Sequence, residues 1–112
     1  MEVFIGDPAQ ARRRVERLLA VNPENVDALL VHGMALRQQG EYGQARKSLE
    51  RGLALSPGYD DFMLVLAGIS ESEDRPKEAI AWYDRYLSRN SGDSKVRMRR
   101  ARIAERMSGQ ER

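Results

Sequence analysis

Cysteine is absent from the 112-residue chain, and histidine occurs once, at His32. Without thiols the chain has no disulfides, no thiolate metal ligands and no cysteine nucleophile. One histidine cannot form a multi-histidine zinc site, and no serine lies in a nucleophile-elbow sequence. The sequence therefore predicts a protein that is not an enzyme, without catalytic residues, metal ligands or cofactors, and His32 is interpreted as a helix-packing residue.

Long apolar runs are also missing. No stretch approaches the ~18 consecutive apolar residues of a membrane helix. Residues 1–5 are too short to be a secretory signal. With 41% hydrophobic and 32% charged residues, the composition is typical of one soluble globular domain without membrane insertion. Composition does not distinguish a cytoplasmic from a periplasmic location.

The net charge of +2 is unevenly distributed. Residues 1–93 carry 12 basic and 15 acidic side chains, whereas residues 94–112 carry 7 basic and 2 acidic ones. The C-terminal segment is therefore the basic part of the chain.

The chain repeats itself with a period of 34 residues. Ala11, Ala45 and Ala79 align at this offset, and so do the leucines at 19, 53 and 87. Pro23 and Pro57 also lie one period apart. A period of this length indicates a stacked helical solenoid, so function is expected on a repeat surface and not in a catalytic pocket.

The middle repeat, residues 26–59, has apolar residues at helical spacing in both halves. A turn at residues 39–41, which includes Gly40, separates the two predicted helices. Ser56, Pro57 and Gly58 end the second one, because proline cannot extend a helix. The repeat therefore predicts a helical hairpin.

This hairpin resembles a tetratricopeptide repeat (TPR), in which small and large residues stand at fixed positions. With Val26 as position 1, the matching residues at positions 8, 17, 20, 24, 27 and 32 are Gly33, Tyr42, Ala45, Leu49, Gly52 and Pro57. The resemblance implies an all-α, right-handed solenoid of antiparallel helices. Gly33 and Gly52 are then interpreted as packing glycines.

The third repeat, residues 60–93, keeps several of these positions and departs at others. Asp74 replaces the turn glycine, and Pro76 replaces the aromatic residue at position 17. Proline is well placed there, because the first turn of a helix needs no N–H donor. Tyr86 replaces the small residue at position 27, so we expect different packing around it.

Both ends of the chain match partial repeats. Residues 1–25 match the second half of a repeat, residues 94–107 form one amphipathic helix with a solvated outer face, and residues 108–112 are a polar tail. A polar outer face is typical of a capping helix. The whole of 1–112 is thus predicted to be one domain with about six helices.

The first predicted helix lacks the preceding helix against which its apolar side chains would pack. Exposed apolar surface favours association, so a homodimer through Phe4, Ile5, Val15 and Leu19 is one expectation. A fold-back of residues 1–5 is another. We favour a third, that the chain is a section of a larger bacterial protein.

The TPR resemblance implies that a partner polypeptide binds the concave face, where repeat positions 2, 5, 9 and 12 lie. The expected groove residues are Asp27, Leu30, Met34, Arg37, Asp61, Leu64, Glu71, Met98 and Arg102. The leucines and methionines would form an apolar stripe flanked by charges. For Leu64, packing between helices is an equal alternative.

Some TPR co-chaperones clamp a C-terminal carboxylate with lysine, asparagine and arginine. The corresponding positions here hold Val31, Asp61 and Val65, so this mode is disfavoured. The third repeat is loosely similar to TPR segments of bacterial envelope proteins that support polysaccharide export. The identity of the partner does not follow from the sequence.

The basic C-terminal helix offers an alternative function. Its arginines at 97, 99, 100, 102 and 106 could neutralise an acidic protein or, as a second choice, nucleic acid. Aromatic residues for base stacking are absent from residues 94–112. A solvated cap is therefore favoured over a nucleic-acid site.

Overall fold

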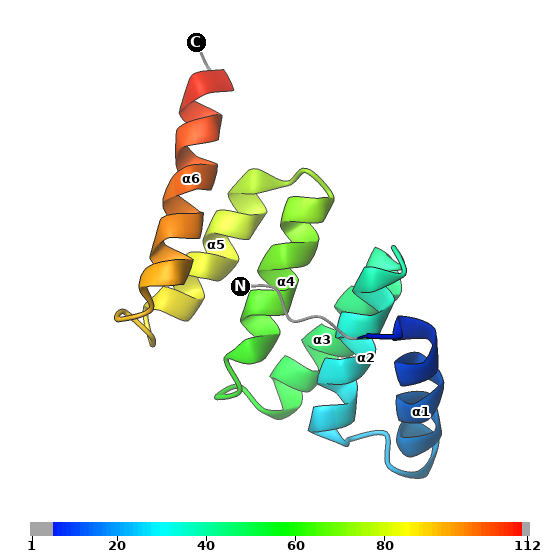
Figure 1. Ribbon diagram of the computed structural model, residues 1–112. Helices are drawn as coiled ribbons and strands as arrows, with labels where there is room; N and C mark the ends of the chain where they lie inside the picture. Colours follow the sequence, from blue (N-terminus) through cyan, green and yellow to red (C-terminus); the bar gives the residue numbers. More distant parts are fainter. Residues whose placement is uncertain (1–5, 111–112) are drawn as a thin grey trace.

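The structure of the protein is a computed structural model that describes residues 6–110. These residues form helices and no strand (Figure 1). The six helices are α1 Pro8–Val21, α2 Val26–Gln38, α3 Tyr42–Leu55, α4 Asp61–Ser72, α5 Pro76–Leu87 and α6 Ser94–Gln110. The predicted all-α solenoid is confirmed.

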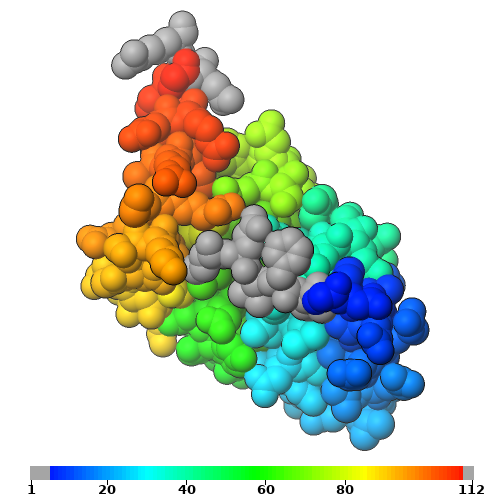
Figure 2. Space-filling view, viewed as in Figure 1, coloured from blue at the N-terminus to red at the C-terminus, as the bar shows by residue number. Residues whose placement is uncertain are grey.

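Successive helices run in opposite directions along one row. In Figure 1, α2, α4 and α6 run upward, and α1, α3 and α5 run downward. The molecule is accordingly elongated, with principal extents of 50 × 27 × 21 Å. The space-filling view follows the row from α1, in blue, to the last turns of α6, in red, which project from the body (Figure 2).

The last helix is longer than the sequence pattern indicates. We expected it to end at Met107, followed by a polar tail from Ser108, but α6 continues to Gln110. Gly109 weakens this last turn, but no proline follows Met107 to end the helix there.

Polar side chains define several helix starts. The carboxylate of Asp7 accepts a hydrogen bond from the backbone N–H of Gln10 at 3.2 Å, and the amide oxygen of Asn25 accepts one from Ala28 at 3.1 Å. Each bond satisfies a donor that has no partner within its helix. These caps place the starts of α1 and α2.

The two hairpin turns share one backbone conformation. Gly40 has a φ of +79°, and Asp74, one period later, has a φ of +57°. In both turns the N–H of the next residue, Glu41 or Arg75, donates to the carbonyl five residues earlier at 2.8 Å. Asp74 therefore takes the conformation of the glycine that it replaces, at a cost of about 1 kcal/mol or more.

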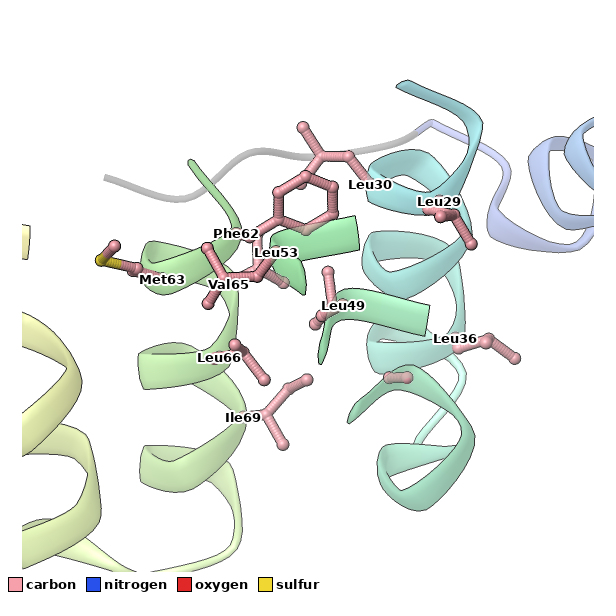
Figure 3. Close-up of a cluster of buried hydrophobic side chains, with 11 residues drawn as sticks. Leu29, Leu30, Leu36, Leu49, Leu53, Phe62, Met63, Val65, Leu66 and Ile69 are labelled. Atoms are coloured by element: carbon pink, nitrogen blue, oxygen red, sulfur yellow. The ribbon is translucent and has the colours of Figure 1, made fainter. Parts of the chain in front are cut away.

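The larger hydrophobic core lies between the α2–α3 hairpin and α4 (Figure 3). Its buried residues are Leu29, Leu30, Leu36, Ala45, Leu49, Leu53, Phe62, Met63, Val65, Leu66 and Ile69. Because these residues come from two consecutive repeats, neither repeat completes this core alone.

Two glycines allow the close approach that this core needs. A Cβ atom on Gly33 would lie 2.3 Å from Cδ2 of Leu49, which packs α3 on α2. A Cβ atom on Gly52 would lie 2.3 Å from Cε1 of Phe62, which packs α4 on α3. Both distances are far below van der Waals contact, so both glycines are packing residues.

A second, smaller core joins α4, α5 and α6. It contains Ala67, Ala79, Tyr83, Val96 and Ile103. Tyr86 is partly buried against both cores. This residue stands at the position of Gly52, and the residue corresponding to Phe62 is the smaller Val96. The junction between α5 and α6 thus exchanges the large and small partners, which accounts for the different packing expected at Tyr86.

Tyr86 also fixes the start of α6. Its hydroxyl donates to Oδ2 of Asp93 at 2.8 Å, while Oδ1 accepts from the backbone N–H of Val96 at 3.2 Å. The hydrogen bond from Tyr86 is the main reason that the pKa of Asp93 lies below its ordinary value, and the bond from Val96 adds to it. The carboxylate of Asp93 is therefore stabilised in its ionised form.

We expect Gly52→Ala to lower the free energy of unfolding by about 1–3 kcal/mol, because the added methyl group meets the rigid ring of Phe62. Gly43→Ala is the matched control. Gly43 lies in the same helix with no atom within 4 Å of its Cβ position, and alanine there is neutral or slightly stabilising. Urea unfolding of both variants measures the difference, and equal losses would contradict this account of α3–α4 packing.

Tyr86→Phe keeps the ring and removes the donor to Asp93. We expect a loss of about 0.5–1.5 kcal/mol at pH 7. Because the pKa of Asp93 is lower in the folded state, its carboxylate stabilises the fold at pH values above its unfolded-state pKa of about 3.9. This contribution disappears as the pH falls through the folded-state pKa. The stability difference between wild type and variant should therefore begin to shrink as the pH falls below about 4 and be smallest below the folded-state pKa of Asp93. An NMR titration of the Asp93 carboxyl group should show a higher pKa in the variant; an unchanged pKa would refute the assignment.

Candidate functional site

An open groove of about 490 Å³ lies between α2 and α4. It is lined by Leu30, Val31, Met34, Arg37, Gln38, Asp61, Leu64 and Val65. Five of these, Leu30, Met34, Arg37, Asp61 and Leu64, are residues that the sequence predicts for the concave surface. The structure therefore brings the central part of the predicted site together.

The floor of the groove is apolar. Leu30 is only 9% exposed and belongs to the larger core. Met34 is partly buried against that core, and Leu64 is partly buried against the smaller one. Leu64 thus packs between helices and also lines the groove.

Charged side chains stand at opposite ends of this floor. Arg37 comes from the last turn of α2 and Asp61 from the first turn of α4. Asp27 does not line the groove. Its carboxylate accepts a hydrogen bond from the hydroxyl of Tyr59 at 3.0 Å, which links α2 to the loop before α4.

Glu71 and Arg102 belong to a different site. They line a second hollow of about 430 Å³ with Arg99, Glu105 and Arg106, between α4 and α6. The carboxylate of Glu71 already accepts hydrogen bonds from the hydroxyl of Tyr83 and from Nε of Arg99 at 2.9 Å. Glu71 therefore joins helices, and it lines the hollow between α4 and α6 and not the groove that contains Leu30 and Met34.

Electrostatics at this junction match its geometry. Burial first, and then the hydrogen bond to Glu71, raises the pKa of Tyr83 well above its ordinary value. The same carboxylate raises the pKa of Arg99 through its hydrogen bond. The side chain of Glu71 is only 15% exposed, so this ion pair is shielded from much of the solvent.

Met98 lines neither hollow in the described part of the chain and is 57% exposed. Its predicted place in the apolar stripe is not observed.

The surface predicted for self-association is only partly available. Phe4 and Ile5 lie outside the described residues. Val15 is 5% exposed, and Leu19 is partly buried against the larger core. The exposed apolar side chains of α1 are instead Leu18 and Val21, at 48% and 88%. Helix α2 packs against α1 and accounts for the burial of Val15 and Leu19.

The arginines of α6 divide into two groups. Arg99 is paired with Glu71, and Arg100 donates to both carboxylate oxygens of Asp84 at 2.8 and 3.3 Å. The hydrogen bond to Asp84 raises the pKa of Arg100. The other three, Arg97, Arg102 and Arg106, are exposed. Arg99 and Arg100 therefore hold α6 against α4 and α5.

His32 lies at the junction of three helices. Its Nδ1 is 2.7 Å from Oγ of Ser48 in α3, and its Nε2 is 3.1 Å from Oε2 of Glu16 in α1. One tautomer satisfies both contacts, with the Ser48 hydroxyl donating to Nδ1 and Nε2–H donating to Glu16. No group of three or more histidine, cysteine or acidic side chains that could hold a metal occurs among residues 6–110.

Sequence reasoning missed three residues that line the groove. Val31 and Val65 occupy position 6 of their repeats, and Gln38 occupies position 13. Val31 and Val65 are noted from the sequence only because they stand where a carboxylate clamp requires asparagine and arginine. Their common repeat position is the signal that could have assigned both.

Comparisons with known proteins agree with this architecture. The tetratricopeptide repeat family model matches residues 2–60 and 30–95. A solved thermophilic TPR protein of Thermus thermophilus is 29% identical with a TM-score of 0.79, over 87% of this chain and 50% of its own. This chain thus spans half the length of that protein. None of the curated protein sequences matches.

Two solved structures of MamA are also similar. The first is 21% identical, with a TM-score of 0.81, and the match covers 96% of this chain and 67% of the MamA chain. The second is 22% identical, with a TM-score of 0.77, and the match covers 91% of this chain and 56% of the MamA chain. At these identities the likeness concerns the fold. Within residues 6–110, none of the helices combines the length and hydropathy required to cross a membrane. From the family match over most of its length, together with its stacked hairpins, the chain belongs to the tetratricopeptide repeat family.

Proposed function

We propose that this chain is a non-catalytic module that binds a partner polypeptide in the groove between α2 and α4. The TPR fold is generally a protein-interaction scaffold, and its members are generally not enzymes. The observation that supports this particular surface is the apolar groove itself, with a floor of Leu30, Met34 and Leu64.

The groove suits a polypeptide better than a small polar molecule. It lies between two helices, and most of its lining consists of aliphatic side chains and one thioether. Methionine adapts its shape to different apolar partners, and burial of such surface supplies most of the binding free energy in an interface core. Arg37 and Asp61 at the two ends would orient the partner.

We expect Met34→Glu combined with Leu64→Glu to weaken partner binding at least about tenfold, because a bound segment would desolvate both carboxylates. Leu30 is unsuitable for this test, since it is part of the core. Leu55→Glu is the matched control, because Leu55 is 41% exposed on α3 and outside the groove.

The measurement is quantitative affinity capture of a bacterial partner by wild type and both variants, with circular dichroism to verify helicity. Loss of the same bound protein from the groove variant alone supports the proposal. If a helical groove variant retains the partner at wild-type affinity, binding occurs on another surface.

The alternative function, nucleic-acid binding through α6, has less support because Arg99 and Arg100 are engaged in ion pairs. We expect no mobility shift of labelled single-stranded DNA or RNA at low salt. A shift that falls steeply with salt and is lost in the Arg97→Gln, Arg102→Gln double variant would favour this alternative, because phosphate contacts release counterions.

A further inference from the structure

Arg37 differs from the other half-buried arginines of the protein. Within residues 6–110, the half-buried arginines are Arg12, Arg37, Arg46, Arg99 and Arg100. Four of them are paired with a carboxylate: Arg12 with Glu16, Arg46 with Glu73, Arg99 with Glu71, and Arg100 with Asp84. The side chain of Arg37 has no hydrogen bond or ion pair to any described residue. A half-buried cation with free donors favours an anionic ligand.

The guanidinium of Arg37 packs against a glycine of the neighbouring helix. A Cβ atom on Gly68 of α4 would lie 2.6 Å from Cζ of Arg37 and 2.7 Å from both terminal nitrogens. The guanidinium therefore crosses from α2 onto the backbone of α4. The helix dipole explains a cation in the last turn of α2, but it does not explain this placement across the groove.

The opposite end of the groove carries the opposite charge. Asp61 lies seven residues before Gly68 on α4, which corresponds to about 10 Å along the helix axis. Between these ends lie Met34 and Leu64. The groove therefore presents a cation, an apolar middle and an anion along one line.

We propose that the occupant of the groove is an amphipathic helix with an acidic residue at position i, apolar residues at i+3 and i+4, and a basic residue at i+7. These positions share one face and span about 10 Å. The acidic residue contacts Arg37, and the basic one contacts Asp61. The helix runs antiparallel to α2 and α4, since an acidic residue is best placed near the N-terminus of its own helix. This inference rests on the proposed groove function.

The test uses two acetylated and amidated alanine-rich peptides of about 16 residues, long enough to be partly helical. The first carries Glu, Leu, Leu and Lys at the stated spacing, and the second has Gln in place of Glu. Binding is followed by NMR of labelled protein, with the methyl signals of Met34 and Leu64 as reporters. We expect the wild type to bind the Glu peptide at least about fivefold more tightly than the Gln peptide.

Variants of the protein complete a double-mutant cycle. Arg37→Gln should bind both peptides equally, whereas Arg97→Gln, which changes an exposed arginine outside the groove, should keep the wild-type preference. Gly68→Ala retains the charge of Arg37 but displaces its guanidinium from the surface of α4. This variant should therefore show a smaller preference for the Glu peptide without loss of helicity.

The outcomes separate this inference from the groove function. If both peptides shift Met34 and Leu64 equally and Arg37→Gln changes nothing, the inference is overturned and the groove remains a binding surface. If neither peptide shifts these signals, the inference is also overturned. The groove function is then decided by the Met34→Glu, Leu64→Glu variant with the bacterial partner.

Discussion

The stacking of this protein depends on a steric constraint between consecutive repeats: one side of each junction must be small where the other is large. At the junction of α3 and α4, Gly52 leaves space that the ring of Phe62 fills. At the junction of α5 and α6, the corresponding residues are Tyr86 and Val96, so the large partner comes from the first helix. The two junctions thus place the larger side chain on opposite helices, and each is closely packed in its own way.

Polar contacts follow the same repeat geometry at the two ends of the array. Glu16 contacts His32 between α1 and α2, and Asp84 contacts Arg100 between α5 and α6. Asp84 and Arg100 stand two periods after Glu16 and His32, so the two contacts use the same repeat positions. At the central junction the residue corresponding to His32 and Arg100 is Leu66, which is fully buried. The pairs at the ends are partly exposed, where a charge loses little hydration. A buried leucine thus occupies at the centre the position that holds a polar contact at each end, while the central junction has its own ion pair, Arg46 with Glu73.

The sequence predicted the helices well because their determinants are local. Apolar periodicity, Gly40 at a turn and Pro57 after a helix each act within a few residues. The site was predicted less well, because its residues meet across helices. Glu71 was assigned to the apolar groove from its repeat position, but that position does not reveal Arg99 and Tyr83 as its partners. Leu30 was expected on the surface, yet packing against α4 buries it.

Helix α4 separates two surfaces of different chemistry. Toward α2 it contributes Asp61, Leu64 and Val65 to an apolar groove, and at its C-terminal end it contributes Glu71 to a charged junction with α6. A partner that continued along the row from the first surface to the second would have to displace Arg99 from Glu71. Breaking a shielded ion pair leaves a charge without its partner, which is costly. The ion pair thus makes the hollow between α4 and α6 less favourable for the proposed partner than the groove between α2 and α4, where the guanidinium of Arg37 has no partner among residues 6–110.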